Sequence, residues 1–361
     1  MGKHSPLFAQ HQAMGGKMVD FGGWDMPLHY GSQIEEHHQV RRQAGMFDVS
    51  HMTLVDIQGI HAKPYLQYLL ANDVAKLDGR PGKALYTAML NHEGGVVDDL
   101  IVYNRESANS CSYRTVVNCA TRSKDLAWMA EIGRDYEVSL EEQTDLAMIA
   151  VQGPEARRRV ARVLPTWTQA IDQLAPFEAF ESDGWFLART GYTGEDGLEI
   201  MLPASAATDF WQQLAEAGVQ PCGLAARDTL RLEAGLNLYG QEMDESVSPL
   251  EANMGWTLAW KPEHRDFVGR QALLDQKARG LKHKLVGVKL LEKGILRPGQ
   301  QLRITEDAAK SGVITSGSFS PTLGQSIALA RVPVEAGDRA QVNRRGKWLE
   351  VELTRPNILR G

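Results

Sequence analysis

The chain has 361 residues, of which 43% are hydrophobic and 23% are charged, and its formal net charge is −6. This length exceeds one domain of about 100–200 residues, and the composition excludes a largely disordered chain. The acidic balance argues against a nucleic-acid ligand, because a negative surface repels phosphate backbones.

The cysteines and the first residues indicate the compartment. Cys111, Cys119 and Cys222 are odd in number and lack the paired spacing of a metal site. They predict free thiols in a reducing environment. The start of the chain has no apolar signal core, and no apolar run reaches the length of a membrane span. We therefore expect a cytoplasmic protein with no membrane partner.

The first clear elements form a hairpin, a third strand and a helix. Alternating apolar residues predict strands over 84–90 and 96–103, joined by a turn rich in Asn and Gly, and a further strand over 113–118. Helical spacing follows over 123–136, where Thr121 is a suitable N-cap.

Strands and helices also alternate in the next part of the chain. The pattern predicts a strand over 146–151, a helix over 154–164, two strands over 185–190 and 198–202, and helices over 204–217 and 224–234. The run Arg157 to Arg159 falls in the first of these helices, where a solvated face is the simplest interpretation.

The composition changes after residue 261. A charged, helix-bearing segment over 262–280 precedes short strand-like runs at 286–290, 312–316, 326–332 and 348–353, separated by Gly and Pro. The sequence therefore predicts an α+β region over 1–275 and a C-terminal β-barrel or jelly-roll-like domain over 280–361.

Two adjacent carboxylates interrupt the apolar strand over 96–103. Period-two geometry places Asp98 and Asp99 on opposite faces, and both faces are otherwise apolar. At least one carboxylate must therefore lie in or near the interior, where it needs partners or a function. The alternative is a carboxylate that pairs with an amide of the turn at Gly94 and Gly95.

A glycine-rich stretch, Gly191 to Ile200, contains another carboxylate among apolar residues. Its glycines permit positive φ and close backbone approach, and Glu199 lies between Leu198 and Ile200. A carboxylate can accept the two parallel N–H bonds of an amino-pyrimidinone, the edge that a pterin presents. The alternative is an ordinary hairpin with Glu199 on its solvent face.

Arg227 and Arg231 lie one helical turn apart in the helix over 224–234. Arginine suits the carboxylate or carbonyl groups of a ligand. The alternative is a salt-bridged helix face, since Asp228 and Glu233 are close in sequence.

The stretch Phe47 to Met52 combines an acid, a hydroxyl and an imidazole. It lacks the Gly-x-Ser-x-Gly elbow of a serine hydrolase, so Asp48 and His51 are expected to make structural hydrogen bonds at a strand end. Metal, nucleotide and dinucleotide motifs are absent from the sequence, so no metal is expected.

Together with others, these stretches form an ordered set of motifs. The set comprises residues 20–24 (DFGGW), 44–52 (AGMFDVSHM), 94–102 (GGVVDDLIV), 150–154 (AVQGP), 191–195 (GYTGE), 226–235 (ARDTLRLEAG), 238–245 (LYGQEMDE) and 315–321 (TSGSFSP). It resembles the glycine cleavage T-protein family, the aminomethyltransferases, over residues 5–356. The resemblance implies a three-domain cloverleaf around a central folate pocket, with residues 1–275 divided into two intertwined subdomains.

The resemblance also implies the activity and its residues. The family acts in glycine catabolism and one-carbon metabolism, and transfers the methylene carbon of an aminomethyl group on lipoylated H-protein to tetrahydrofolate, releasing ammonia. Asp99 is then the catalytic carboxylate. The implied folate-binding residues are Tyr86, Tyr103, Asn118, Tyr192, Glu199 and Arg227, and Arg360 is a further basic candidate. Because H-proteins are acidic, Arg157 to Arg159 and the segment 261–284 are candidate docking surfaces.

Three other functions remain open at this point. The nearest is a folate-dependent demethylase of a small methylated substrate, which has no need of H-protein. Another is a non-enzymatic folate-binding assembly or regulatory protein. Relatives of that kind carry a reactive cysteine in the stretch around Tyr239, and this chain has none there. The last is a serine hydrolase built on Ser50 and His51.

Overall fold

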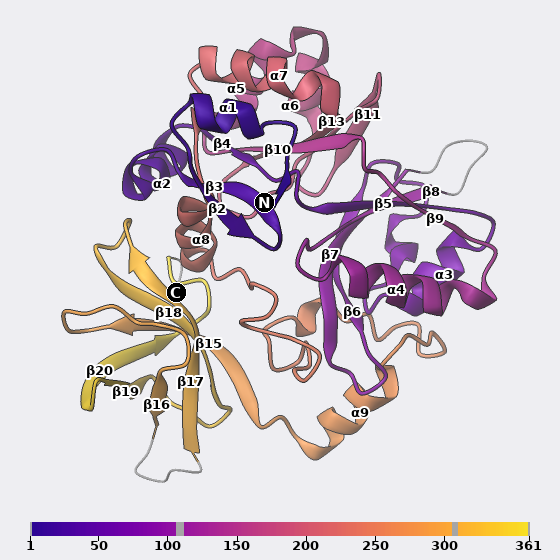
Figure 1. Ribbon diagram of the computed structural model, residues 1–361. Helices are drawn as coiled ribbons and strands as arrows, with labels where there is room; N and C mark the ends of the chain where they lie inside the picture. The colour runs from indigo at the N-terminus through magenta and orange to yellow at the C-terminus, as the bar shows by residue number, and fades with distance from the viewer. Residues whose placement is uncertain (1, 106–111, 305–309, 360–361) are drawn as a thin grey trace. The chain divides into compact units, whose positions relative to one another are not determined.

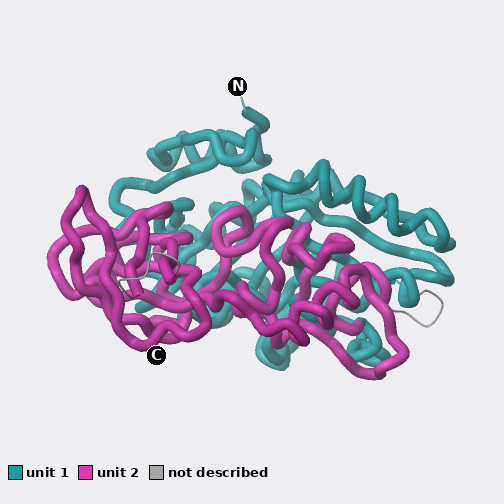
Figure 2. Tube along the Cα trace, turned by 90° about the horizontal axis from the view of Figure 1, so that it is seen from below, with its two compact units in different colours: residues 1–66, 74–86, 100–228 teal, residues 67–73, 87–99, 229–361 magenta. Residues whose placement is uncertain are grey.

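A computed structural model describes residues 2–105, 112–304 and 310–359. The chain divides into two compact units, coloured separately in Figure 2. The first contains residues 1–66, 74–86 and 100–228, and the second contains residues 67–73, 87–99 and 229–361. In the described part of the chain, no helix is long and apolar enough to cross a membrane.

Helices are distributed over most of the chain (Figure 1). The α-helices are α1 (Phe8–Ala13), α2 (Gln33–Arg42), α3 (Ala62–Leu69), α4 (Arg122–Ile132), α5 (Ala156–Val163), α6 (Thr168–Gln173), α7 (Ala204–Glu216), α8 (Leu224–Glu233) and α9 (Arg270–Arg279). Short 3-10 turns are η1 (Val74–Leu77), η2 (Gly133–Asp135), η3 (Pro165–Trp167) and η4 (Gly255–Thr257).

The strands before residue 280 form three sheets. The small sheet has the order β1-β3-β2, with β1 (Lys3–His4), β2 (Lys17–Phe21) and β3 (Trp24–His29). The second has the order β11-β12-β13-β10-β4-β14, with β4 (Gly45–Asp48), β10 (Leu146–Gln152), β11 (Ala179–Ser182), β12 (Trp185–Ala188), β13 (Gly197–Pro203) and β14 (Gln220–Pro221). The third has the order β6-β7-β8-β5-β9, with β5 (Thr53–Gln58), β6 (Ala84–Leu90), β7 (Val96–Asn104), β8 (Ser112–Val117) and β9 (Ser139–Glu142).

The remaining strands close into a six-stranded barrel. Its order is β15-β18-β17-β16-β19-β20, with β15 (His283–Leu290), β16 (Gln301–Arg303), β17 (Ser311–Ser320), β18 (Gln325–Pro333), β19 (Arg339–Arg344) and β20 (Lys347–Thr354). Alternate residues such as Val286, Val288 and Leu290 are buried inside it. Closure leaves no free sheet edge, which explains how so short a domain protects its strands.

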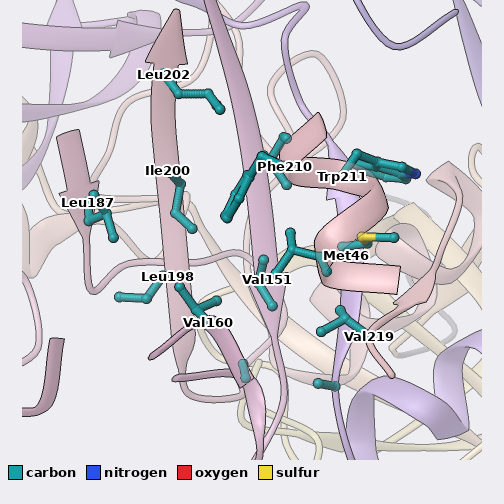
Figure 3. Close-up of a cluster of buried hydrophobic side chains, with 14 of the residues drawn as sticks. Met46, Val151, Val160, Leu187, Leu198, Ile200, Leu202, Phe210, Trp211 and Val219 are labelled. Atoms are coloured by element: carbon teal, nitrogen blue, oxygen red, sulfur yellow. The ribbon is translucent and has the colours of Figure 1, made fainter. Parts of the chain in front are cut away.

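The core of the first unit lies between the second sheet and the helices that cover it (Figure 3). Both central strands contribute alternate residues, as period-two geometry requires: Ile149 and Val151 from β10, and Leu198 and Ile200 from β13. Phe210, Trp211 and Leu214 of α7, and Val160 of α5, pack against them. This packing fixes the strand that carries Glu199.

The prediction of a mixed α+β chain with a C-terminal all-β barrel is confirmed, and most strands begin within a few residues of their predicted positions. One local prediction is correct in position only. Thr121 stands at the N-cap of α4, but its hydroxyl donates to the carbonyl of Asn118 at 3.1 Å and accepts no helix N–H. Cys111 and Arg360 lie outside the described residues, whereas Cys119 and Cys222 are free thiols.

Candidate active site

Glu199 is buried in the middle of β13, with 6% of its surface exposed. Its neighbours in the sheet are Ala150 of β10 and Ala188 of β12. Thr190 donates its hydroxyl to Oε2 of Glu199 at 2.7 Å. A solvent-facing hairpin is therefore wrong for this residue. Since a carboxylate has about four lone-pair sites, one hydrogen bond leaves Glu199 able to accept more.

Tyr103 extends this hydrogen-bonded chain. Its hydroxyl lies 3.1 Å from the hydroxyl of Thr190, and its ring packs edge-on against Phe186. Burial, followed by the nearby charge of Glu199, raises the pKa of Tyr103 well above its ordinary value. The phenol is therefore neutral and fully buried. Thr190, which connects the two predicted residues, has no distinctive sequence signal.

Arg227 on α8 lies over the ring of Tyr192, with its guanidinium carbon 4.9 Å from the ring centroid. Its Nη1 is buried and has no hydrogen-bond partner among the described residues. Burial lowers the pKa of Arg227 from its ordinary value, while Glu199 and Tyr192 act in the opposite direction. A buried donor without an acceptor is costly, so Arg227 is suited to an acceptor from outside the chain.

The glycine-rich turn that carries Tyr192 is fixed from β10. Gln152, at the end of that strand, donates from Nε2 to the carbonyl of Thr190 at 3.1 Å and accepts from Thr193 at 2.9 Å. A Cβ on Gly191 would lie 1.9 Å from Oε1 of Gln152, so a larger residue there would displace the amide of Gln152. Gln152 thus orients the turn, a role that its place at a strand end did not indicate.

Arg231, one turn after Arg227, belongs to a different arrangement in the second unit. Its Nη1 lies 3.0 Å from Oε2 of Glu242, and its Nη2 donates to Ser316 at 2.8 Å. Thr315 donates to the other oxygen of Glu242 at 2.6 Å. The salt-bridge interpretation is therefore right for Arg231, although the pair is buried and not on a solvated helix face.

The strand β7 carries Asp98 and Asp99. Asp98 has no exposed surface, whereas Asp99 is partly exposed, so the two carboxylates face different environments. The expectation of at least one interior carboxylate is confirmed. The turn before the strand is closed by Asn91, whose Oδ1 accepts the N–H of Gly95 at 2.8 Å. A side chain at Gly95 is impossible without rearrangement, because its Cβ would lie 1.7 Å from the carbonyl oxygen of Glu245.

Tyr86 and Asn118 lie on either side of β7 in the third sheet, because β6 and β8 both flank that strand. Tyr86 lies in β6 and is partly exposed. Asn118 is also partly exposed and comes one residue after β8, so it lies past the strand that we expected to contain it. The first unit thus brings together Tyr103, Tyr192, Glu199 and Arg227. Asp99 belongs to the second unit.

Asp48 is the centre of a buried network at the end of β4. Its Oδ2 accepts from Ser5 at 2.5 Å and lies 2.8 Å from Nε2 of His11, and its Oδ1 accepts the N–H of Ser50 at 2.9 Å. The hydrogen bonds lower the pKa of Asp48 although burial alone raises it, so its carboxylate is ionised. The structural role expected for Asp48 is present.

His51, three residues later, differs from that expectation. It is 5% exposed, and its Nδ1 is buried without a hydrogen-bond partner among the described residues. Phe21 packs edge-on against its ring at 5.2 Å. The prediction that His51 makes a structural hydrogen bond is therefore wrong for its Nδ1 atom.

Ser50 is not arranged as a nucleophile. Its hydroxyl donates to the carbonyl of Met148 at 3.3 Å and accepts the N–H of the same residue at 3.1 Å. The hydroxyl thus fastens the turn to β10, and this geometry opposes the serine-hydrolase alternative. Among the residues that the structure describes, no group of three or more His, Cys, Asp or Glu side chains could hold a metal ion.

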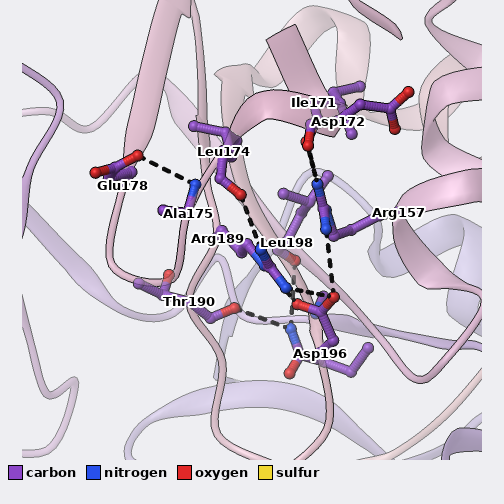
Figure 4. Close-up of polar contacts among 12 residues, drawn as sticks. Arg157, Ile171, Asp172, Leu174, Ala175, Glu178, Arg189, Thr190, Asp196 and Leu198 are labelled. Carbon is purple, nitrogen blue, oxygen red and sulfur yellow. Dashed lines mark hydrogen bonds and ion pairs between the residues drawn. The ribbon is translucent and has the colours of Figure 1, made fainter. Parts of the chain in front are cut away.

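Arg157 and Arg159 are engaged within the chain, as Figure 4 shows for the first of them. Arg157 donates to the carbonyls of Ile171 and Asp172 at 2.6 and 2.9 Å. Arg159 pairs with Glu155. Arg157 and Arg158 line a surface hollow of about 420 Å³ beside α5 and α6. Only Arg158 of the run is exposed, so the run offers less free charge than its sequence indicates.

Comparisons with known proteins agree on the family. The sequence model of the GCVT N-terminal domain matches residues 7–262, and that of the glycine cleavage T-protein C-terminal barrel domain matches residues 283–358. An aminomethyltransferase of Pseudomonas syringae pv. tomato is 57% identical over 361 residues, which covers 100% of this chain and 98% of that protein. The chain belongs to the glycine cleavage T-protein family.

A solved structure supports the assignment at the level of the fold. The glycine cleavage system aminomethyltransferase T from Bartonella henselae superposes with a TM-score of 0.91 at 33% identity, and the match covers 99% of this chain and 98% of that chain. The chain is thus an aminomethyltransferase enzyme of the glycine cleavage type. The family resemblance inferred from the ordered motifs is confirmed.

Proposed function

We propose that this enzyme transfers the methylene carbon of aminomethyl-lipoyl H-protein to tetrahydrofolate in the cytoplasm. Two folate N–H bonds are replaced by two C–N bonds to the transferred carbon. Ammonia and the dihydrolipoyl thiol leave with the displaced protons, and methylenetetrahydrofolate is the product. The chemistry calls for an oriented amine and a balance for developing positive charge.

The observation that carries the proposal is that the first unit contains both a buried carboxylate with acceptor capacity left, Glu199, and a buried donor without a partner among the described residues, Nη1 of Arg227. Glu199 retains acceptor capacity beyond its bond from Thr190, and the amino-pyrimidinone edge of a pterin offers two parallel N–H donors. Arg227 supplies a buried donor for an oxygen of the same ligand. Tyr192 supplies an aromatic face next to it.

Asp99 is the catalytic carboxylate in this proposal, and Tyr86, Tyr103 and Asn118 complete the folate-binding residues. An ionised Asp99 accepts a hydrogen bond from the attacking nitrogen and stabilises an iminium-like state. The partial exposure of Asp99, against the complete burial of Asp98, supports the assignment of the reacting carboxylate to Asp99.

The test combines the purified protein, tetrahydrofolate and aminomethyl-lipoyl H-protein, and follows ammonia release. Asp99→Asn keeps the shape and removes the charge, so turnover should fall by the equivalent of about 2.7–4 kcal/mol while folate affinity is mostly retained. Asp98→Asn is the matched neighbour on the opposite face of the strand. Normal turnover in Asp99→Asn would remove Asp99 from the mechanism.

The two remaining alternatives have different outcomes in the same assay. Folate binding without ammonia release from H-protein, but with formation of methyltetrahydrofolate from a small methylated donor, would favour the demethylase. Folate binding without any turnover would favour a non-enzymatic role. The 57% identity to an aminomethyltransferase over the whole chain argues against both.

A further inference from the structure

Two of the buried polar atoms of the first unit that lack a hydrogen-bond partner among the described residues come from different elements. Nδ1 of His51, in the turn after β4, and Nη1 of Arg227, on α8, make no hydrogen bond to any described residue. The strand register places the turn of His51 near this site, because Ala150 of β10 pairs with Phe47, four residues before His51, and with Glu199, whose charge acts on Arg227. The charge of Arg227 also lowers the pKa of His51. Since buried polar groups in native proteins are nearly always satisfied, two such atoms near each other mark a place suited to a polar ligand.

The turn that carries His51 is held rigidly. Asp48 accepts the N–H of Ser50, and the N–H of Met52 donates to the carbonyl of Val49 at 3.0 Å. The Ser50 hydroxyl fastens the same turn to Met148. A side chain on such a preorganised turn is suited to a binding site, because little conformational entropy is lost when a ligand arrives.

The imidazole of His51 is neutral under ordinary conditions. Burial lowers its pKa to about 4, and Arg227 acts in the same direction, while Asp48 opposes both. The negative charge of Glu199 favours the charged form of Arg227 and so raises its pKa, against the effect of burial. A neutral imidazole carries one N–H donor and one acceptor, so His51 can donate from Nδ1 without adding charge to the site.

We propose that His51 is a further folate-binding residue, whose Nδ1 hydrogen-bonds the same folate molecule as Nη1 of Arg227. The guanidinium of Arg227 has donors only, so it selects an oxygen acceptor in this neighbourhood. The Nδ1–H of His51 donates to a carbonyl or carboxylate oxygen of the folate. This assignment rests on the folate-binding function proposed above and adds one residue to it.

Two variants test which ring nitrogen of His51 binds the folate. In His51→Asn the amide nitrogen occupies the place of Nδ1, whereas in His51→Gln the amide lies near the place of Nε2. The affinity for 5-formyltetrahydrofolate, a stable reduced folate, is measured by calorimetry for each full-length protein. We expect a loss of about tenfold in His51→Gln, because a buried hydrogen bond to the ligand is removed, and a change of less than about threefold in His51→Asn.

The unfolding midpoint without folate distinguishes binding from a structural role. If His51 only maintained the fold, both variants would lower the midpoint and the affinity together. We expect similar midpoints in the two variants, with a smaller folate-induced rise in His51→Gln. In steady-state assays the same variant should raise KM for tetrahydrofolate more than it lowers kcat.

Three outcomes would overturn the inference. Wild-type affinity in His51→Gln would show that no bond is lost, and an equal loss in both variants would show that Nδ1 is not the bonding atom. Wild-type affinity in Arg227→Met would show that Arg227 does not contact the folate, and therefore that the two side chains do not share one ligand. Failure of the wild-type protein to bind the folate would instead overturn the proposed function, and this inference with it.

Discussion

Two arginines one turn apart on α8 have opposite environments. Arg231 is buried and has protein partners for its guanidinium, Glu242 and Ser316. Arg227 packs on Tyr192 and has a buried Nη1 with no partner among the described residues. The same residue type in the same helix is thus structural at one position and available to a ligand at the next.

The contrast between the satisfied Arg231 and the unsatisfied Arg227 gives a criterion for recognising a ligand site when no ligand is bound. A charged group that is fully satisfied by the chain contributes to stability only through its network, and its loss exposes an unpaired partner. A charged group that folding leaves unsatisfied lowers stability and is retained for another purpose. Variants at the two arginines should therefore separate stability from affinity.

The largest effect is expected where the network is complete. Arg231→Met removes one partner of the buried pair and leaves Glu242 without its counter-charge, so the free energy of unfolding should fall by about 3–5 kcal/mol. Urea unfolding measures the change. The double variant Arg231→Met with Glu242→Leu should recover part of the loss, and a double variant as unstable as the sum of the singles would contradict the pairing.

The lowered pKa of the buried His51 should make the stability of the protein depend on pH. Its pKa is about 4 in the folded protein and 6.5 in its unperturbed state, so the unfolded chain binds a proton between these values and the folded chain does not. The free energy of unfolding should therefore fall by about 3 kcal/mol as the pH decreases from 6.5 to 4. His51→Asn should remove this component from a urea titration across the same range. Equal slopes in the two proteins would contradict the depressed pKa.

The effect at Arg227 should appear in affinity and not in stability. Arg227→Met keeps the apolar contact with Tyr192 and removes the unsatisfied donor. We expect the affinity for 5-formyltetrahydrofolate to fall by at least about tenfold, which corresponds to about 1.4 kcal/mol. The free energy of unfolding without folate should stay within about 1 kcal/mol of the wild type or rise. A large loss of stability with unchanged affinity would make Arg227 equivalent to Arg231.

The smallest effect is expected at an exposed ion pair, which serves as a control. Nζ of Lys347 lies 3.4 Å from Oε2 of Glu292, and both side chains are exposed. Lys347→Gln should change the free energy of unfolding by less than about 0.5 kcal/mol and leave folate affinity unchanged. A larger change would mean that the urea measurements do not resolve specific networks.

Helices and strands that are defined by a local sequence pattern were predictable from the sequence alone. The strand predicted over 84–90 is found at Ala84–Leu90, and the helix predicted over 204–217 is found at Ala204–Glu216, because apolar periodicity and turn residues define both. The ordered motifs determined the family. The interior position of at least one carboxylate in β7 also followed from alternation alone.

Which polar side chains find hydrogen-bond partners depends on the tertiary structure and could not be predicted from the sequence. Thr190 and Gln152 orient Glu199 and the turn of Tyr192 through contacts with residues distant in sequence, so neither carries a local signal. Arg227 and Arg231 lie one turn apart on the same helix, and the presence of Glu242 beside Arg231 separates their roles. His51 was expected to bond locally, whereas its Nδ1 remains unsatisfied. Periodicity shows where a side chain can point, but the partners that it meets there depend on how distant segments pack.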